Sequence, residues 1–235
     1  MRSGVLSRNP FRGLTRFEQA LWLTSLVVVG ASFVAAGQLD PLTVAASLVG
    51  VTALILIARG DVWGQILVAA FGIMYAIISI RYHYYGEAIT YLGMSVPITV
   101  ATVVAWLRHP HDGTHEVKVH QLSAPQRALI APATLVVTIG SYFVLAALGT
   151  ANLWVSTVSI ATSFAASYLL LFRSPYYALA YAVNDVVLIV LWVLASIEDP
   201  AYLPMVACFT MFLANDAYGF YNWFRMKERQ RPAEG

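Results

Sequence analysis

Two Asn-Asp pairs are the residues of this sequence with the clearest capacity for chemistry. They are Asn184-Asp185 and Asn215-Asp216, and each interrupts a long apolar run. An amide both donates and accepts hydrogen bonds, whereas a carboxylate accepts them or pairs with a cation. A charged residue at the centre of a bilayer costs about 2.5–3.5 kcal/mol or more, so such residues usually mark a functional site. The two pairs therefore predict a binding site inside a membrane.

A purely structural role for the same residues is the alternative interpretation. Asn side chains hydrogen-bond across membrane helix bundles for about 0.6 kcal/mol on average. That gain is smaller than the cost of burying two charged aspartates, although a protonated aspartate is cheaper to bury. We therefore favour a water-accessible cavity, with a purely structural role in helix packing as the remaining alternative.

The composition places these pairs in an integral membrane protein. The chain has 235 residues, of which 59% are hydrophobic and 11% charged, and its mean hydropathy is +0.69. A soluble domain is about 25% charged. The net charge of +2 gives no reason to expect a nucleic-acid partner, and the single Cys208 cannot form an internal disulfide.

The pattern of apolar runs predicts an all-α protein with eight transmembrane helices, because a span needs about 20 mostly apolar residues. The expected spans are residues 17–36, 42–58, 62–80, 87–106, 128–148, 152–172, 176–196 and 203–224. With this count every Lys and Arg except Arg81 falls on one side of the membrane, as the positive-inside rule requires. The rule predicts a multi-pass protein of the cell inner (plasma) membrane with both termini in the cytoplasm.

The chain also resembles itself at an offset of 117 residues. Trp106 then falls on Trp223 and Arg108 on Arg225, and chance matching of residues at membrane edges is the alternative. A single linker helix between two three-helix repeats gives both repeats the same orientation, which is a transporter architecture with its site at the midplane between the repeats. The expected organisation is a cytoplasmic segment at 1–16, an extra helix at 17–36, a first repeat at 42–106, a cytoplasmic loop at 107–127, the linker helix at 128–148, a second repeat at 152–225 and a cytoplasmic tail at 226–235.

Helical rise places both Asn-Asp pairs at the same depth. Asn184 lies about 16 Å and Asn215 about 15 Å from one membrane edge, in a hydrocarbon core about 30 Å thick. Residues at helical spacing around the pairs, and polar or aromatic residues of the first repeat, complete the expected substrate site. The full set is Asn184, Asp185, Asn215, Asp216, Tyr181, Trp192, Phe212, Tyr218 and Asn222, with Gln65, Tyr75 and Tyr91 on the opposite wall.

The expected spans contain no Lys or Arg, which argues against a phosphorylated ligand. Carboxylates and aromatic rings favour a neutral or cationic small molecule instead. We expect no enzyme and no cofactor, because no catalytic motif is present. The histidines between His109 and His120 lack convincing metal-site spacing, so a solvated linker is preferred over a metal site.

Three stretches of the sequence resemble the PnuC-type vitamin transporter family. They are "YYALAYAVNDVVLIVLWVLASIEDPAYLPMVACFTMFLANDAYGFYNW", "FRGLTRFEQALWL" and "YYGEAITYLGMSVP", and the likeness extends from about Phe11 to Trp223. The resemblance implies a SWEET-like fold of two three-helix repeats around a linker helix. It also implies a homo-oligomer, with a trimer as the expected state.

The resemblance further implies a function in vitamin uptake for NAD biosynthesis. Members import nicotinamide riboside by facilitated diffusion, and phosphorylation inside the cell traps it. Midplane Asn residues of the second repeat bind substrate in that family, which corresponds to Asn184 and Asn215. Riboside carriers are expected to have Trp one turn after the first Asn, where this chain has Leu188. Transport of a deoxynucleoside, thiamine or riboflavin, and proton coupling through Asp185 and Asp216, therefore stay open.

Overall fold

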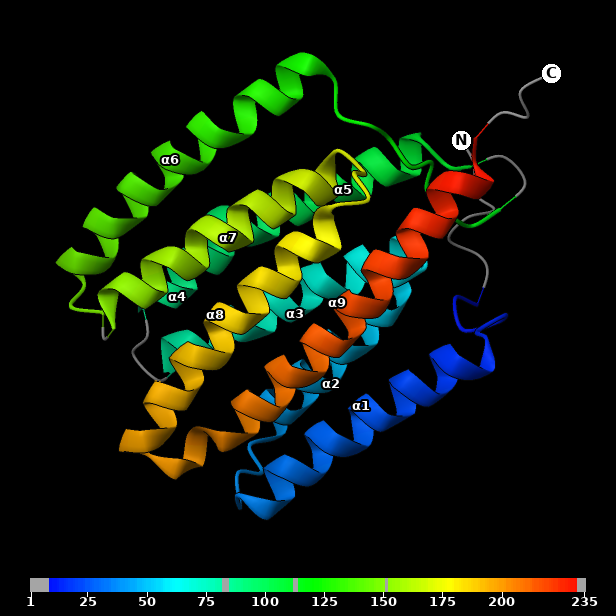
Figure 1. Ribbon diagram of the computed structural model, residues 1–235. Coiled ribbons are helices and arrows are strands. Elements are labelled where there is room, and N and C mark those ends of the chain that lie inside the picture. The colour runs from blue at the N-terminus through cyan, green and yellow to red at the C-terminus, as the bar shows by residue number, and fades with distance from the viewer. Residues whose placement is uncertain (1–8, 82–84, 112–113, 151, 232–235) are drawn as a thin grey trace.

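The computed structural model describes residues 9–81, 85–111, 114–150 and 152–231, and within these it contains helices and no strand (Figure 1). The elements in chain order are α1 (Arg16–Ala35), α2 (Pro41–Ala58), α3 (Val62–Arg81), α4 (Tyr85–Thr90), the π-helical turn η1 (Tyr91–Ser95), α5 (Val96–Arg108), α6 (Ala124–Ala147), α7 (Leu153–Leu171), α8 (Tyr177–Glu198), the 3-10 turn η2 (Pro200–Tyr202) and α9 (Leu203–Arg229). Each predicted span has a counterpart, with α4, η1 and α5 together forming the fourth. The predicted fold class is confirmed.

Seven of these spans are long and apolar enough to cross a membrane. The exception is α9, which carries Asn215, Asp216 and Asn222 in its length and ends in charged residues. This helix packs against α1, α2 and α8. Its polar side chains are therefore buried against protein, where hydrogen-bond partners exist, and not against lipid.

Local capping explains where several helices begin. Thr15 and Glu18 form a capping box at the start of α1, and Asp40 accepts hydrogen bonds from the backbone and hydroxyl of Thr43 at the start of α2. These hydrogen bonds lower the pKa of Asp40, so this cap stabilises the fold at neutral pH and is lost as the pH falls through that lowered pKa. Ser123 caps α6, which begins four residues before the predicted position.

The contacts between helices show how the two repeats fit together. Within the repeats, α2 packs on α3 and α3 on α5, as α7 packs on α8 and α8 on α9. Between the repeats, α2 contacts α9 and α5 contacts α7. The first helix of each repeat thus meets the third helix of the other, as expected for two repeats related by a two-fold axis. The linker helix α6 packs on α7 at one edge of the bundle, and α1 lies at the opposite edge (Figure 1).

Charged groups from distant parts of the sequence meet at one end of the bundle, where α1 begins and α9 ends (Figure 1). Arg59 donates hydrogen bonds to the carbonyl oxygens of Pro10 and Gly13, each at 3.2 Å. Arg229 forms an ion pair of 2.7 Å with Glu116. The clustering agrees with the predicted distribution of cations, and the assignment of this end to the cytoplasm stays a prediction.

Close packing of α2 against α3 yields a first testable prediction. A Cβ atom at Gly64 would lie 2.6 Å from the backbone nitrogen of Ile57 and 2.8 Å from the carbonyl oxygen of Ala53. Because backbone cannot yield cheaply, we expect Gly64→Ala to lower the free energy of unfolding by about 1–3 kcal/mol. Gly30→Ala is the matched control, since a Cβ there meets nothing within 4 Å. Thermal unfolding of both purified variants is the measurement, and equal melting temperatures would contradict the packing.

Candidate functional site

A chamber of about 140 Å³ lies between the two repeats. Its walls come from α2, α3, α4, η1 and α5 on one side and from α7, α8 and α9 on the other. Pockets that bind small molecules usually measure about 300–1,000 Å³. The chamber in this conformation is smaller than such pockets.

The second repeat supplies the polar wall of this chamber, through Asn184, Asp185 and Asp216. Asn184 accepts a hydrogen bond of 2.7 Å from the hydroxyl of Thr162 on α7. This bond engages the amide oxygen of Asn184 and leaves its N–H groups as donors for a ligand. The neighbouring helix thus orients the amide that the sequence placed at the midplane.

Asp185 and Asp216 lie next to each other, within hydrogen-bonding range, although they belong to α8 and α9. Only 3% and 4% of their surfaces are exposed. Oδ2 of Asp185 has no hydrogen-bond partner within the described part of the chain. Among the described residues that line the chamber, none is Lys or Arg. A buried carboxylate oxygen without a partner is rare, so this one is suited to a ligand that brings a donor or a positive charge.

Aromatic rings from both repeats also line the chamber. Phe71, Tyr91 and Phe212 line it, with Phe71 ring centroids 6.1 Å from Tyr91 and 6.4 Å from Phe212. Tyr75 packs against Tyr91 in a tilted arrangement, with ring centroids 4.5 Å apart, and does not itself line the chamber. The π-helical turn η1 places both Tyr91 and Ser95 at the chamber wall. Such turns are frequent at functional sites because they redirect side chains out of the regular helical register.

A stripe of hydroxyl groups on α7 is part of the site that sequence reasoning missed. Ser159, Ser163 and Ser167 all line the chamber. Their spacing of four residues puts them on one helix face, and this spacing was readable in the sequence. Serine is an ordinary residue at helix contacts in membranes, so this spacing alone does not indicate a ligand site. The Ser167 hydroxyl also shares a 2.8 Å hydrogen bond with the Tyr181 hydroxyl, another lining residue.

Asn215 is placed outside the chamber lining, although its neighbour Asp216 is within it. The amide of Asn215 donates to the hydroxyl of Ser25 on α1 at 3.0 Å and to the carbonyl oxygen of Met211 at 2.7 Å. Consecutive residues of an α-helix point about 100° apart, so Asp216 can face the chamber while Asn215 faces α1. The sequence did not show which face of α9 would meet α1.

Tyr218 and Asn222 also lie outside the chamber and fasten α9 to its neighbours. The Tyr218 hydroxyl donates to the buried carboxylate of Glu18 on α1 at 2.7 Å. The Asn222 amide donates to the carbonyl oxygen of Ala58 on α2 at 2.9 Å. Both side chains are helix-to-helix contacts in this structure.

Two further predicted residues lie away from the lining. Trp192 packs beside Tyr202, with ring centroids 5.6 Å apart, and Gln65 is buried at 1% exposure. Neither the indole nitrogen of Trp192 nor the amide nitrogen of Gln65 has a hydrogen-bond partner in the described residues. The chamber thus brings together Asn184, Asp185, Asp216, Tyr181, Phe212 and Tyr91 of the expected set.

The histidine-rich loop shows no clustering of metal ligands in the portion that the structure describes, which leaves out Asp112. Nδ1 of His109 lies 2.8 Å from the carbonyl oxygen of Ala105, and Nε2 of His120 lies 3.3 Å from the amide oxygen of Gln126. These rings contact the ends of neighbouring helices.

Comparison with known proteins agrees with this architecture. The family model described as nicotinamide mononucleotide transporter matches residues 40–225. A curated relative, the nicotinamide riboside transporter PnuC of Neisseria mucosa, is 26% identical over 94% of this chain and 86% of its own length. The solved structure described as the vitamin B3 transporter PnuC superposes with a TM-score of 0.80 at 26% identity, covering 94% of this chain and 96% of that one.

The fold and its central chamber therefore define a multi-pass membrane transporter for a small molecule, and its relatives are transporters and not enzymes. The chain belongs to the nicotinamide mononucleotide transporter family, whose model spans both three-helix repeats. The predicted resemblance to PnuC-type transporters is confirmed.

The contact between Tyr218 and Glu18 gives a prediction that distinguishes a structural contact between α1 and α9 from a role in ligand binding. We expect Tyr218→Phe to lower the free energy of unfolding by about 1.5–3 kcal/mol, because it removes a hydrogen bond to a buried charged group. Transport per folded molecule should not change. Tyr221→Phe is the control, since that side chain is 58% exposed. Thermal unfolding measures the first effect and uptake assays measure the second. Loss of uptake without loss of stability would show that Tyr218 acts in substrate binding and not in holding α1 against α9.

Proposed function

We propose that this protein imports nicotinamide riboside through the chamber between its repeats. One observation carries the proposal: two adjacent buried carboxyl groups share the chamber with aromatic rings and with no cationic lining residue among those described. The pyridinium ring of the riboside is positively charged and flat, so carboxylates can pair with it and aromatic faces can stack on it. The relative from Neisseria mucosa carries the same substrate in its name, which supports the choice.

The sugar of the riboside has a matching partner in α7 and α8. Ser159, Ser163 and the free N–H groups of Asn184 offer donors and acceptors along one wall. We place the ribose hydroxyls against this wall and the pyridinium ring between Asp185 and the aromatic residues. This orientation satisfies the unpartnered Asp185 oxygen with the charge of the ring.

The unphosphorylated nucleoside is preferred over the mononucleotide. A phosphate group needs Arg or Lys side chains, or converging helix N-termini, to replace its water. Asp185 and Asp216 would instead repel it at the chamber. The family description names a mononucleotide, and the chemistry of this lining favours its dephosphorylated form.

For the mechanism we propose facilitated diffusion as a uniporter with alternating access. The α2–α9 and α5–α7 contacts join the two repeats, so rocking at these contacts would open the chamber to one side and then to the other. Phosphorylation inside the cell would trap the substrate. We place the protein in the inner membrane, with both termini and the loop 107–127 in the cytoplasm, because nearly all cations then obey the positive-inside rule. We propose that it is a homo-oligomer from the resemblance to PnuC-type transporters alone.

Two alternatives each have an observation in their favour. Leu188 lines the chamber at the position where a riboside carrier is expected to have Trp, and this smaller, apolar residue favours a deoxynucleoside. The adjacent Asp185 and Asp216 favour proton coupling. A protonophore that abolishes uptake into proteoliposomes, where no trapping occurs, would indicate coupling, whereas unchanged uptake supports a uniporter.

The carboxyl groups provide a test of the substrate's charge. We expect Asp185→Asn to weaken binding of nicotinamide riboside roughly tenfold or more, because the variant loses the attraction between carboxylate and cation. Binding of the neutral nucleoside thymidine should not fall. Titration of the purified variant by thermal shift measures both, with Asp199→Asn as a control because Asp199 is exposed at the N-cap of η2, and Asn can also accept the hydrogen bond from Ala201 N–H. An equal loss for both nucleosides would count against recognition of the positive charge.

The two asparagines provide a second test. We expect Asn184→Ala to reduce riboside uptake roughly tenfold, because it removes donors from the chamber wall. Asn215→Ala should instead lower stability, since its contacts are with Ser25 and Met211. Uptake normalised to folded protein distinguishes the two effects. If Asn215→Ala abolishes uptake while the melting temperature is unchanged, Asn215 belongs to the substrate site and its assignment to stability is wrong.

A further inference from the structure

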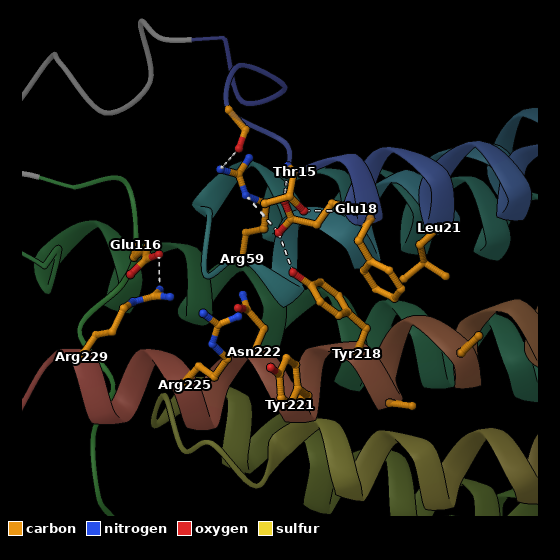
Figure 2. Close-up of a pocket in the computed structure, with 14 residues that line it drawn as sticks. Thr15, Glu18, Leu21, Arg59, Glu116, Tyr218, Tyr221, Asn222, Arg225 and Arg229 are labelled. Atoms are coloured by element: carbon orange, nitrogen blue, oxygen red, sulfur yellow. Dashed lines mark hydrogen bonds and ion pairs between the residues drawn. The ribbon is translucent and has the colours of Figure 1, made fainter.

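A second and larger hollow, of about 860 Å³, lies between α1 and α9 at the charged end of the bundle (Figure 2). None of its lining residues also lines the chamber between the repeats. It opens where α1 begins and α9 ends, which is the end that collects Arg59, Arg225 and Arg229. We call this hollow the α1–α9 groove.

Two of the three arginines in the α1–α9 groove lie beside carboxylates of the protein, and the third does not. Arg59 lies 3.6 Å from the carboxylate of Glu18, and Arg229 lies 2.7 Å from that of Glu116. The Arg225 guanidinium lies over the ring of Tyr221, 5.6 Å from its centroid, and forms no hydrogen bond or ion pair with the described residues. Its five N–H donors are therefore free to bind an anion, and a ring beneath a guanidinium holds it in place.

The other end of the groove is apolar. Leu21 lies away from Arg225 and Arg229 in Figure 2, and Phe17, Ala214 and Ala217 belong to the same lining. Arg225 is ten residues beyond the midplane residue Asn215, hence about 15 Å from it and at the membrane edge. The small side chains of Ala214 and Ala217 leave space beside that face of α9. The groove thus runs from a cationic mouth at the membrane surface into an apolar slot within the hydrocarbon.

We propose that the α1–α9 groove binds an anionic phospholipid from the leaflet at the charged end. The headgroup phosphate would lie on Arg225, with Arg229 beside it, and one acyl chain would lie along Leu21 and Ala217. Charge and shape support this occupant, because basic pockets between transmembrane helices bind anionic headgroups. A soluble anion would use the mouth but gain nothing from the slot. Such a lipid would bridge α1 and α9, and α9 carries Asp216 of the transport chamber.

The test measures lipid binding to the purified full chain by native mass spectrometry and by thermal unfolding in nanodiscs of phosphatidylcholine with or without phosphatidylglycerol. We expect phosphatidylglycerol to raise the melting temperature. Arg225→Gln should weaken that binding about fivefold. Arg108→Gln is the matched control, because Arg108 is exposed at the corresponding position of the first repeat and outside the groove.

Ala217→Leu tests the apolar slot without changing charge, and it should also weaken phosphatidylglycerol binding. Equal losses in the Arg225 and Arg108 variants would show a general surface-charge effect and overturn the proposal. So would stabilisation by inorganic phosphate or glycerol 3-phosphate equal to that by the lipid, since it would identify a soluble anion. These readouts do not involve transport, so they are independent of the proposed function.

Discussion

Polar groups buried inside this bundle must find partners within the protein, because hydrocarbon offers none. That constraint accounts for the position of α9, the most polar of the long helices. Its Asn215, Tyr218 and Asn222 side chains bond to α1 and α2. Its Asp216 instead turns toward Asp185, where the remaining hydrogen-bonding capacity is left for a ligand. One face of α9 therefore forms hydrogen bonds to α1 and α2, and another face lines the chamber.

The same constraint gives the extra helix α1 a physical role. Without α1, Asn215 would lose the hydroxyl of Ser25, and Tyr218 would lose the carboxylate of Glu18. These groups would then face lipid, at a cost of several kcal/mol for each group left unsatisfied. The family match begins at residue 40, after α1. This helix thus lies outside the matched region while its side chains satisfy polar groups inside it.

The internal repeat provides symmetry in the backbone and asymmetry in the chemistry. The paired contacts α2–α9 and α5–α7 show that the two repeats meet in equivalent ways. The second repeat nevertheless contributes both carboxyls, the amide and the serines, whereas aromatic rings come from both repeats. An asymmetric ligand with a flat charged ring and a hydroxylated sugar suits this asymmetry, because the carboxyls and the amide lie on one side only, while rings on both sides can contact the flat ring.

Much of this architecture could be read from the residues alone. Apolar runs of spanning length, separated by Gly, Pro and charged residues, determined the eight helices, because each run must bury its backbone polar groups in a helix. Depth along each helix placed Asn184, Asp185 and Asp216 at the midplane, because the rise per residue is constant.

Rotation about each helix axis was decided only by tertiary packing. Asn215 faces α1, Trp192 packs beside Tyr202, and the serines of α7 line the chamber because of which helix lies beside which. A linear sequence records depth within a helix, whereas the direction a side chain faces depends on neighbours that are distant along the chain.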